Sequence, residues 1–221
     1  MADKWVTFDC FGTLMDWQTG FRRAVASIAG GRAAALVEAY HQAEHETQDA
    51  GPTRPYRDVL RLTMQRAGET VGLSLDDHDA DVLARTWAEM PIFPDTEASL
   101  RQLHVDGWKI AILTNCDNAL FAKTEATFPV KLDMLVTSQE VGSYKPSLGH
   151  FKEFEKRSGV ARDRWVHAAV AWYHDMRPAQ ELGIKRVWVD RENTGQDPSI
   201  CTVHIHDMAG LPEVLRSFGI E

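Results

Sequence analysis

Ionisable side chains follow several apolar stretches of this sequence, and their types would suit covalent catalysis. Asp9 comes directly after the first stretch, Lys145 stands in the segment that follows the third, and Asp175 follows the fourth. A carboxylate that attacks a substrate must be deprotonated, oriented and partly stripped of water. A neighbouring ammonium would lower its pKa and balance its charge. Asp9 is therefore a candidate nucleophile, and Lys145 is a candidate counter-ion.

Three further polar residues accompany them at corresponding places. Thr13, Thr114 and Asn115 could donate hydrogen bonds to the carboxylate or to a substrate. Taken singly, such residues are usually turn formers or helix caps. The ordered set, with each member placed after an apolar stretch, favours a functional site.

The apolar stretches themselves predict the strands of a parallel sheet, because they alternate with amphipathic, helical patterns. Predicted strands cover residues 4–8, 108–113, 132–137, 165–171, 185–190 and 202–206. Predicted helices of the same part of the chain cover residues 95–105, 118–127, 147–158, 177–182 and 211–218. In open α/β sheets, ligands bind outside the carboxyl ends of the strands, where the candidate residues would converge.

Residues 15–92 carry helical periodicity throughout and interrupt the sheet pattern straight after its first strand. Helices are predicted over 20–50, with a break at Gly30-Gly31, over 56–67, and over 75–87 with Ser74 as its cap. We interpret residues 15–92 as an inserted helical cap subdomain, and residues 1–14 and 93–221 as the core.

Composition narrows the class of partner. The chain has 221 residues, 44% of them hydrophobic, and a formal net charge of -8 without a run rich in Lys or Arg, which argues against nucleic acid and anionic membranes as partners. Its three cysteines lack metal-ligand or disulfide spacing, which suits a reducing cytoplasm. The N-terminus lacks the apolar region of a signal peptide, and no apolar run approaches the ~20 residues that span a bilayer. We predict a cytoplasmic protein.

Four motifs in this order resemble those of the haloacid dehalogenase superfamily, and more closely its type II (L-)2-haloacid dehalogenases. The resemblance covers nearly the whole chain and implies a Rossmann-like α/β core with an inserted helical cap. It also implies Asp9 as covalent nucleophile, with Thr13, Thr114, Asn115, Lys145 and Asp175 as further catalytic residues. The motifs read FDCFGTLMD (Phe8–Asp16), ILTNCD (Ile112–Asp117), SYKPSLGHF (Ser143–Phe151) and YHDMRPAQELG (Tyr173–Gly183).

Two departures from the phosphoryl-transferring branch of this superfamily point to the dehalogenase branch. That branch carries a second Asp two residues after the nucleophile, where this chain has Phe11. It also binds magnesium through acids of the fourth motif, where the stretch 170–175 of this chain holds one acid, Asp175. Halide leaves as a stable anion and needs neither a proton nor a metal. The resemblance thus implies a metal-independent hydrolase of small 2-haloacids, without a cofactor. Asp9 would form an ester with the substrate, and Asp175 or His174 would position or deprotonate the water that cleaves it.

Substrate contacts are expected from Phe11, Tyr40, His41, Trp172 and His174. Tyr40 and His41 stand where the resemblance places a cap Arg that meets the substrate, and a His cannot reproduce a bidentate Arg fork. Trp172 and His41 would then shape a different pocket, or else Trp172 is a core residue and His41 a solvated one. The resemblance further implies a small-molecule haloacid as partner and a homodimer formed through the cap.

Two other functions stay open on the sequence. One is a hydrolase that keeps the Asp9 nucleophile but cleaves another bond, such as a phosphate ester or a C–N bond. The other is a catalytically silent relative that binds a metabolite or a partner.

Overall fold

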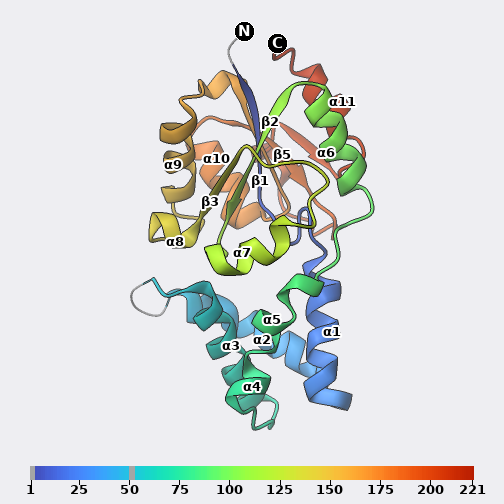
Figure 1. Ribbon diagram of the computed structural model, residues 1–221, viewed down its shortest axis with the longest axis vertical. Coiled ribbons are helices and arrows are strands. Elements are labelled where there is room, and N and C mark those ends of the chain that lie inside the picture. Colours follow the sequence, from blue (N-terminus) through green and yellow to red (C-terminus); the bar gives the residue numbers. More distant parts are fainter. Residues whose placement is uncertain (1–2, 50–52) are drawn as a thin grey trace. The chain divides into compact units, whose positions relative to one another are not determined.

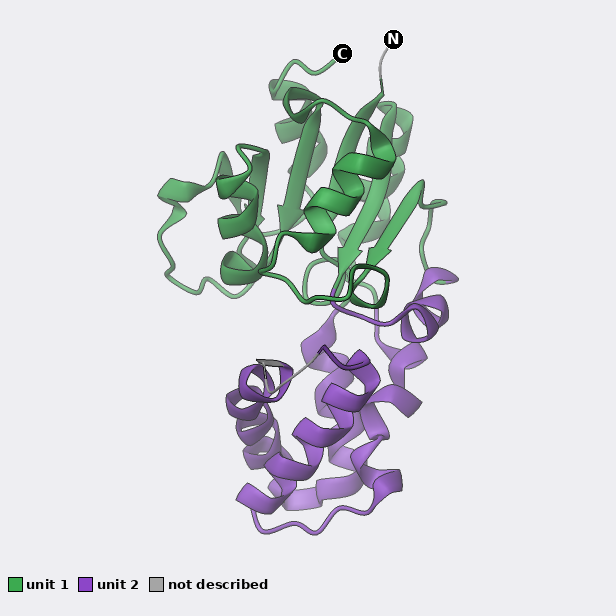
Figure 2. Cartoon of the chain, turned by 90° about the vertical axis from the view of Figure 1, so that its left-hand side faces the viewer, with its two compact units in different colours: residues 1–15, 92–114, 127–221 green, residues 16–91, 115–126 purple. Residues whose placement is uncertain are grey.

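The computed structural model describes residues 3–49 and 53–221 (Figure 1). The chain divides into two compact units, drawn in two colours in Figure 2. The first unit comprises Met1–Met15, Ile92–Thr114 and Thr127–Glu221, and the second comprises Asp16–Pro91 and Asn115–Ala126. The assignment of residues 15–92 as a cap stays a proposal. In the described part of the chain, no helix combines the length and the apolar character needed to cross a membrane.

The first unit is built on a six-stranded, wholly parallel sheet with the order β3-β2-β1-β4-β5-β6. The strands β1 and β2 are buried along almost their whole length, as expected when both faces of a parallel sheet are covered. The predicted α/β fold is confirmed. The strands are β1 Lys4–Phe8, β2 Trp108–Thr114, β3 Met134–Thr137, β4 Trp165–Ala169, β5 Lys185–Val189 and β6 Val203–Ile205.

Strand order decides where the candidate residues meet. Phe8, the last residue of β1, pairs with Ile112 of β2 and with Ala168 of β4. From β1 the chain continues outward through β2 and β3, and then crosses to β4 on the other side of β1. The gap between β1 and β4 is the switch point of this topology, where ligands bind in open α/β sheets.

Helices cover both faces of the sheet. Figure 1 shows α9 and α10 on one side of it and α6 and α11 on the other. The core on the α9 side joins strand residues such as Trp5 and Leu113 to Phe151 and Phe154 of α9. The helical elements of this unit are α6 Thr96–Val105, α8 Ser138–Val141, α9 Gly149–Ser158, η3 Arg162–Arg164, the π-helix η4 Trp172–Met176, α10 Arg177–Glu181, η5 Pro198–Ile200 and α11 Leu211–Ser217.

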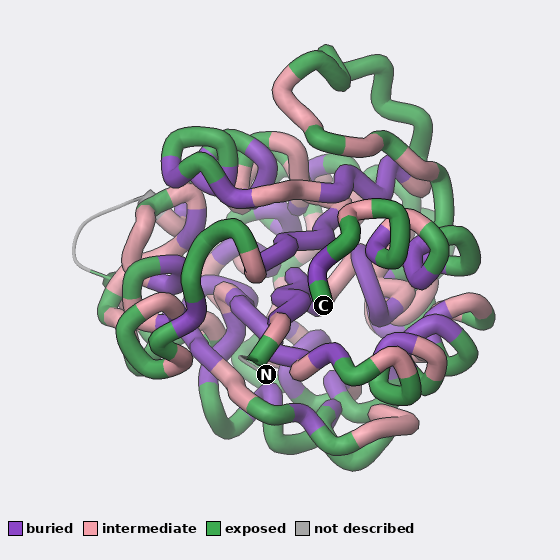
Figure 3. Tube along the Cα trace, turned by 90° about the horizontal axis from the view of Figure 1, so that it is seen from above, coloured by how far each residue is buried: buried purple, intermediate pink, exposed green. Residues whose placement is uncertain are grey.

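The second unit is helical. Its largest contacts join α2 to α3 and α1 to α2, around a core that includes Phe21 and Tyr40, whose ring centroids lie 4.7 Å apart. Asp16 begins α1 by accepting a hydrogen bond from the backbone N–H of Thr19. Figure 3 marks the buried stretches of both units in purple. The elements are α1 Trp17–Ala29, η1 Gly30–Arg32, α2 Ala33–Asp49, α3 Tyr56–Thr70, α4 Asp77–Ala80, α5 Val82–Arg85, η2 Trp87–Glu89 and α7 Asn118–Glu125.

The prediction of one continuous helix over residues 75–87 was wrong. Three short elements, α4, α5 and η2, occupy this stretch, and the first begins after Asp76 rather than Ser74. The carboxylate of Asp76 accepts a hydrogen bond of 2.8 Å from the backbone N–H of Asp79. A run of aspartates offers several competing caps, and local side-chain hydrogen bonds of this kind interrupt a helix.

Candidate active site

Asp9 lies just beyond β1, and hydrogen bonds from Thr13 and Lys145 hold its side chain. The Thr13 hydroxyl donates to its Oδ2 at 2.9 Å, and Lys145 Nζ donates to its Oδ1 at 2.9 Å. Asp9 is only 8% exposed, so little of its ordinary hydration remains. A buried carboxylate whose two oxygens are fixed in this way is oriented and largely desolvated.

The loop that follows β1 reverses tightly behind Asp9. The carbonyl of Cys10 accepts hydrogen bonds from the backbone N–H groups of Leu14 and Met15. Gly12 has φ +93°, a conformation that side chains with a Cβ rarely adopt, and an added Cβ would lie 3.1 Å from Cγ1 of Val170. The turn and its close approach to the segment after β4 therefore both require glycine.

Thr13 joins this loop to the neighbouring strand end. Its Oγ1 donates to Asp9 and accepts a hydrogen bond of 2.9 Å from the backbone N–H of Val170. The Thr13 carbonyl accepts two hydrogen bonds from the guanidinium of Arg191, which also binds the carboxylate of Asp95. Both ends of Thr13 are thus fixed by groups of the first unit.

Lys145 is shared between two carboxylates. Its ammonium lies 2.9 Å from Asp9 Oδ1 and 2.7 Å from Asp175 Oδ1, and it is 2% exposed. Burial by itself would lower the pKa of Lys145, but the charges of Asp175 and Asp9 outweigh it and raise that pKa. Lys145 is consequently a permanent cation at neutral pH.

Asp175 is fully buried on the π-helix η4. Its Oδ1 accepts hydrogen bonds from Lys145 and from Nε2 of His167, at 2.7 and 2.9 Å. Its Oδ2 is buried and, within the residues that the structure describes, has no hydrogen-bond partner. A hydrogen bond from a water or a substrate atom to this oxygen would offset the free-energy cost of burying an acceptor without a partner. π-Helical turns recur at functional sites.

The pKa values of the two carboxylates are shifted in opposite directions. Burial alone would raise the pKa of Asp175, but the charge of Lys145 and the His167 hydrogen bond lower it to about 2. Burial raises the pKa of Asp9, and the nearby charge of Asp175 adds to this against the opposing effect of Lys145. Asp9 is thereby the more basic carboxylate of the two, and burial outweighs the lowering of its pKa that was expected from Lys145.

Two buried histidines behind this group were missed at the level of sequence. His167 bonds to Asp175 through Nε2 and to the Thr7 hydroxyl, at 2.8 Å, through Nδ1. Thr7 in turn accepts a hydrogen bond from the indole N–H of Trp165. The one signal in the sequence is a His in the middle of an apolar strand, WVHAA, which also fits an ordinary core residue.

His150, the other missed histidine, lies in the first turn of α9 and faces the end of β2. Its Nε2 lies 3.0 Å from the carbonyl of Thr114, and because a carbonyl only accepts, Nε2 carries the proton. Burial lowers the pKa of His150 to about 4, and the charge of Lys145 adds to this effect. His150 is therefore neutral at pH 7 and orients the end of β2.

The remaining predicted residues of the first unit lie around η4 and the loop after β1. Phe11 is half-buried, two positions after Asp9. The indole N–H of Trp172 donates to the carbonyl of Asp197, and its ring packs against the buried cluster that contains Trp188. The ring of His174 contacts that of Tyr173. These contacts of Trp172 are those of a packing residue.

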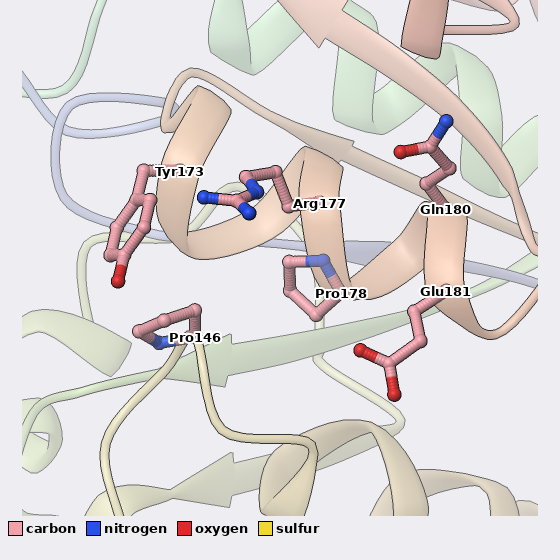
Figure 4. Close-up of a pocket in the computed structure, with 6 residues that line it drawn as sticks. All are labelled: Pro146, Tyr173, Arg177, Pro178, Gln180 and Glu181. Carbon is pink, nitrogen blue, oxygen red and sulfur yellow. The ribbon is translucent and has the colours of Figure 1, made fainter.

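A pocket of about 420 Å³ borders the segments that carry Lys145 and Asp175. Pro146 forms one wall, and the rest comes from η4 and α10 (Figure 4). The guanidinium of Arg177 lies 5.4 Å from the centroid of the Tyr173 ring. The lining residues are Pro146, Tyr173, Arg177, Pro178, Gln180 and Glu181.

Asn115, Tyr40 and His41 belong to the second unit. The Oη of Tyr40 and Nε2 of His41 are buried and make no hydrogen bond within the described part of the chain. One turn along α2, Glu44 accepts a hydrogen bond of 3.0 Å from the Tyr56 hydroxyl, and burial raises the pKa of Glu44. This unit therefore holds a half-buried polar pair, Glu44 and Tyr56, one turn from Tyr40.

Asp117, which follows Asn115, has a structural function. Its two carboxylate oxygens accept hydrogen bonds from the backbone N–H groups of Tyr56 and Arg57, at 2.7 and 2.8 Å. These N–H groups belong to the first turn of α3, where a negative charge is favourable. The catalytic role expected for Asn115 stays a prediction.

Comparison with known proteins places this chain in a family. A family model described as haloacid dehalogenase-like hydrolase matches residues 4–168. An (S)-2-haloacid dehalogenase of Pseudomonas putida is 24% identical over 203 residues, which cover 87% of this chain and 86% of that protein. A phosphoserine phosphatase of Thermus thermophilus is 28% identical over 147 residues, or 65% of this chain and 58% of that one. The crystal structure of an L-2-haloacid dehalogenase superposes with a TM-score of 0.87 at 21% identity, covering 98% of this chain and 100% of the other.

Proposed function

Because this chain belongs to the haloacid dehalogenase-like hydrolases, we propose that it hydrolyses the carbon–halogen bond of small 2-haloacids through an ester on Asp9. One observation carries the proposal. The buried carboxylate of Asp9 is bonded to Lys145 and Thr13, and the residue two places after it is the apolar Phe11. The (S)-2-haloacid dehalogenase of Pseudomonas putida supports this choice of bond.

The first step forms one bond and breaks one. A carboxylate oxygen of Asp9 attacks the carbon that bears the halogen, and halide leaves from the opposite side with the bonding electrons. Lys145 and Thr13 hold the carboxylate in one orientation, so that little entropy is lost on attack. Burial removes most of the hydration of Asp9, so that less water must be displaced from the carboxylate before it attacks.

Phe11 favours a leaving group that needs no proton. An alkoxide that leaves a phosphate ester requires a general acid, and a phenyl ring can neither give nor take a proton. Halide departs as a stable anion without such help. The half-buried ring of Phe11 would instead lower the local polarity beside the nucleophile.

The second step cleaves the ester with water. Water attacks Cγ of Asp9, and the bond breaks between Cγ and the ester oxygen that joins it to the substrate carbon. That oxygen, which came from Asp9, takes one proton of the water and leaves as the hydroxyl of the product, while the second proton is released to solvent as the carboxylate of Asp9 forms again. Lys145 stabilises the negative charge that develops on the carbonyl oxygen. We propose that Asp175 orients the attacking water through its buried Oδ2, because a carboxylate with a pKa of about 2 is a weak base at neutral pH.

Tyr40 and His41 stay the proposed substrate-binding residues of the second unit. Their buried, unbonded polar atoms, as far as the described residues extend, would recover a hydrogen bond on binding an anionic carboxylate. Asn115 stays a proposed hydrogen-bond donor. Trp172 has a packing contact of its own, so His174 is the better proposed substrate contact near Asp175.

The test is halide release from chloroacetate and bromoacetate in the presence of EDTA, with the halide measured by ion chromatography. We expect turnover by the native protein, none by Asp9→Asn, and unchanged turnover by Asp163→Asn, which alters an exposed aspartate. A single turnover in ¹⁸O-labelled water with enzyme in excess should place the label in Asp9 and leave the product hydroxyl unlabelled. Label in the product would show direct attack by water and would contradict the ester.

A phosphatase is the second candidate, because a phosphoserine phosphatase is among the relatives. It predicts magnesium-dependent hydrolysis of p-nitrophenyl phosphate and no halide release. A silent binding relative predicts neither activity, with ligand-induced thermal stabilisation that Asp9→Asn leaves unchanged.

A further inference from the structure

Three potential metal ligands gather at the far edge of the sheet. Asp190 directly follows β5, His204 lies in the edge strand β6, and His206 directly follows that strand. One ligand atom from each residue lies within 4.8 Å of the other two. None of the three takes part in the hydrogen bonds that join Asp9, Thr13, Lys145 and Asp175, which together form the Asp9 group.

The strand geometry explains this convergence. The rings of His204 and His206 contact each other, with centroids 4.7 Å apart. Strand β5 pairs with β6 through Val189 and Ile205, and the Asp190 N–H donates to the Ile205 carbonyl at 2.8 Å. The end of β5 is thereby held beside both histidines.

Asp190 is buried and already oriented by a second residue. Its Oδ1 accepts hydrogen bonds from the backbone N–H and the hydroxyl of Thr194, at 3.0 and 3.2 Å. Its Oδ2 is left to face Nε2 of His204 at 3.3 Å. The side chain of Asp190 is 1% exposed, so its Oδ2, which faces His204, has little access to solvent.

Each imidazole is also oriented. Nδ1 of His206 lies 3.1 Å from the carbonyl of Asp190, and since a carbonyl only accepts, Nδ1 must carry the proton of a neutral ring. Nε2 of His206 then has a free lone pair, which is the ligand form of histidine. The ring of His204 stacks on Trp188, with centroids 4.4 Å apart.

We propose that Asp190, His204 and His206 bind one transition-metal dication of the zinc class. Two imidazole nitrogens and one carboxylate oxygen suit such ions, whereas Mg²⁺ and Ca²⁺ prefer sets made of oxygen alone. Bond lengths of about 2.0–2.2 Å in a tetrahedral site place ligand atoms roughly 3.3 Å apart, which is the spacing of Asp190 Oδ2 and His204 Nε2.

Calorimetric titration of metal-free, untagged protein with Zn²⁺ tests the site. We expect one equivalent to bind, with affinity lowered at least tenfold in His204→Ala and in His206→Ala. His104→Ala removes an exposed histidine elsewhere and should bind like the native protein. Asp9→Asn and Cys201→Ser should also bind normally, which separates this site from the Asp9 group and from the half-buried thiol of Cys201.

Cobalt provides a second readout. Co²⁺ bound to the same three residues should give visible d–d absorption that both histidine variants lose. Absence of a stoichiometric site, or binding that the two variants leave intact, would overturn the proposal. Circular dichroism of each variant shows that it is folded, and because the two histidines lie at the edge of the sheet, their removal should not unfold the chain. The outcome is independent of halide release.

Discussion

At the scale of single residues, the decisive feature is one buried ammonium that serves two carboxylates. Neither Asp9 nor Asp175 has a second cation among the partners described for it. A buried charge that loses its partner is strongly destabilising, because its desolvation is no longer offset. Lys145 therefore matters to folding as well as to the proposed chemistry.

Lys145→Met should cost about 3–5 kcal/mol in the free energy of unfolding at pH 7, measured by urea denaturation. It should also abolish halide release, because Asp9 would lose the group that orients it. Lys152→Met removes an exposed lysine of α9 and should change the unfolding free energy by less than about 0.5 kcal/mol. Equal stability of the two variants would contradict the shared ion pair.

Asp175 gives a dependence of stability on pH with a definite sign. Its pKa is about 2 in the folded chain and about 3.9 when unfolded, so its charge stabilises the fold fully above about pH 4. This contribution falls as the pH drops from about 4 towards 2. Urea unfolding at pH 5 and pH 3 should thus show a smaller difference between native protein and Asp175→Asn at pH 3. A difference that grows on acidification would refute the depressed pKa.

At the scale of elements, the loop after β1 is fixed by backbone geometry. Gly12→Ala should destabilise the protein by roughly 1–3 kcal/mol, because it combines φ +93° with a contact of 3.1 Å to Val170. The shift of this loop should also lower the rate of halide release, since Asp9 and Thr13 flank Gly12.

The matched control is Gly210→Ala, where φ is -81° and an added Cβ meets nothing within 4 Å. Urea unfolding and initial rates would be compared for both variants. A Gly12→Ala protein as stable and active as the Gly210→Ala protein would show that the turn tolerates a side chain.

Elements were predicted from the sequence where one pattern dominated. Strand β1 was predicted at its observed bounds, because a short apolar run ends sharply at Asp9 and Gly12. The prediction for residues 75–87 was wrong because several aspartates compete as helix caps. Helix α8 was missed because its four residues are too few to show a helical periodicity. The π-helix η4 depends on packing around Asp175, which no local pattern reveals.

The candidate site was predicted only in part. Asp9 and Thr13 follow β1, Lys145 follows β3 and Asp175 follows β4, so the order of the strands was enough to bring them together. His150 and His167 were missed because a buried histidine and an apolar core residue occupy the same kind of position in the sequence. Hydrogen bonds to Thr114 and Asp175, which exist only in the folded chain, distinguish them.

At the scale of the whole molecule, the Asp9 group sits at the switch point of the sheet, between β1 and β4. Sites built in this way often lower stability for the sake of function. The raised pKa of Asp9 means that its ionised form is disfavoured by the fold.

Asp9→Asn should accordingly raise the unfolding free energy of the whole protein by about 0.5–2 kcal/mol at pH 7, although it abolishes turnover. Because a raised carboxyl pKa weakens the native protein only where Asp9 is ionised, this gain should shrink as the pH falls. Thermal unfolding followed at pH 7 and pH 5 measures it, with Asp163→Asn as control. A loss of stability in Asp9→Asn at pH 7 would show that the native charge is favourable instead.

Because Lys145 is shared by Asp9 and Asp175, the net charge of these three side chains changes during the proposed cycle. The resting group holds one more negative than positive charge. In the proposed cycle, ester formation neutralises Asp9, and the departing halide carries the excess negative charge into solvent. What stays behind is a balanced Lys145–Asp175 pair that has no excess anion to repel. Hydrolysis restores the surplus and sheds a proton, so each turnover discharges and recharges the interior while acid is produced outside.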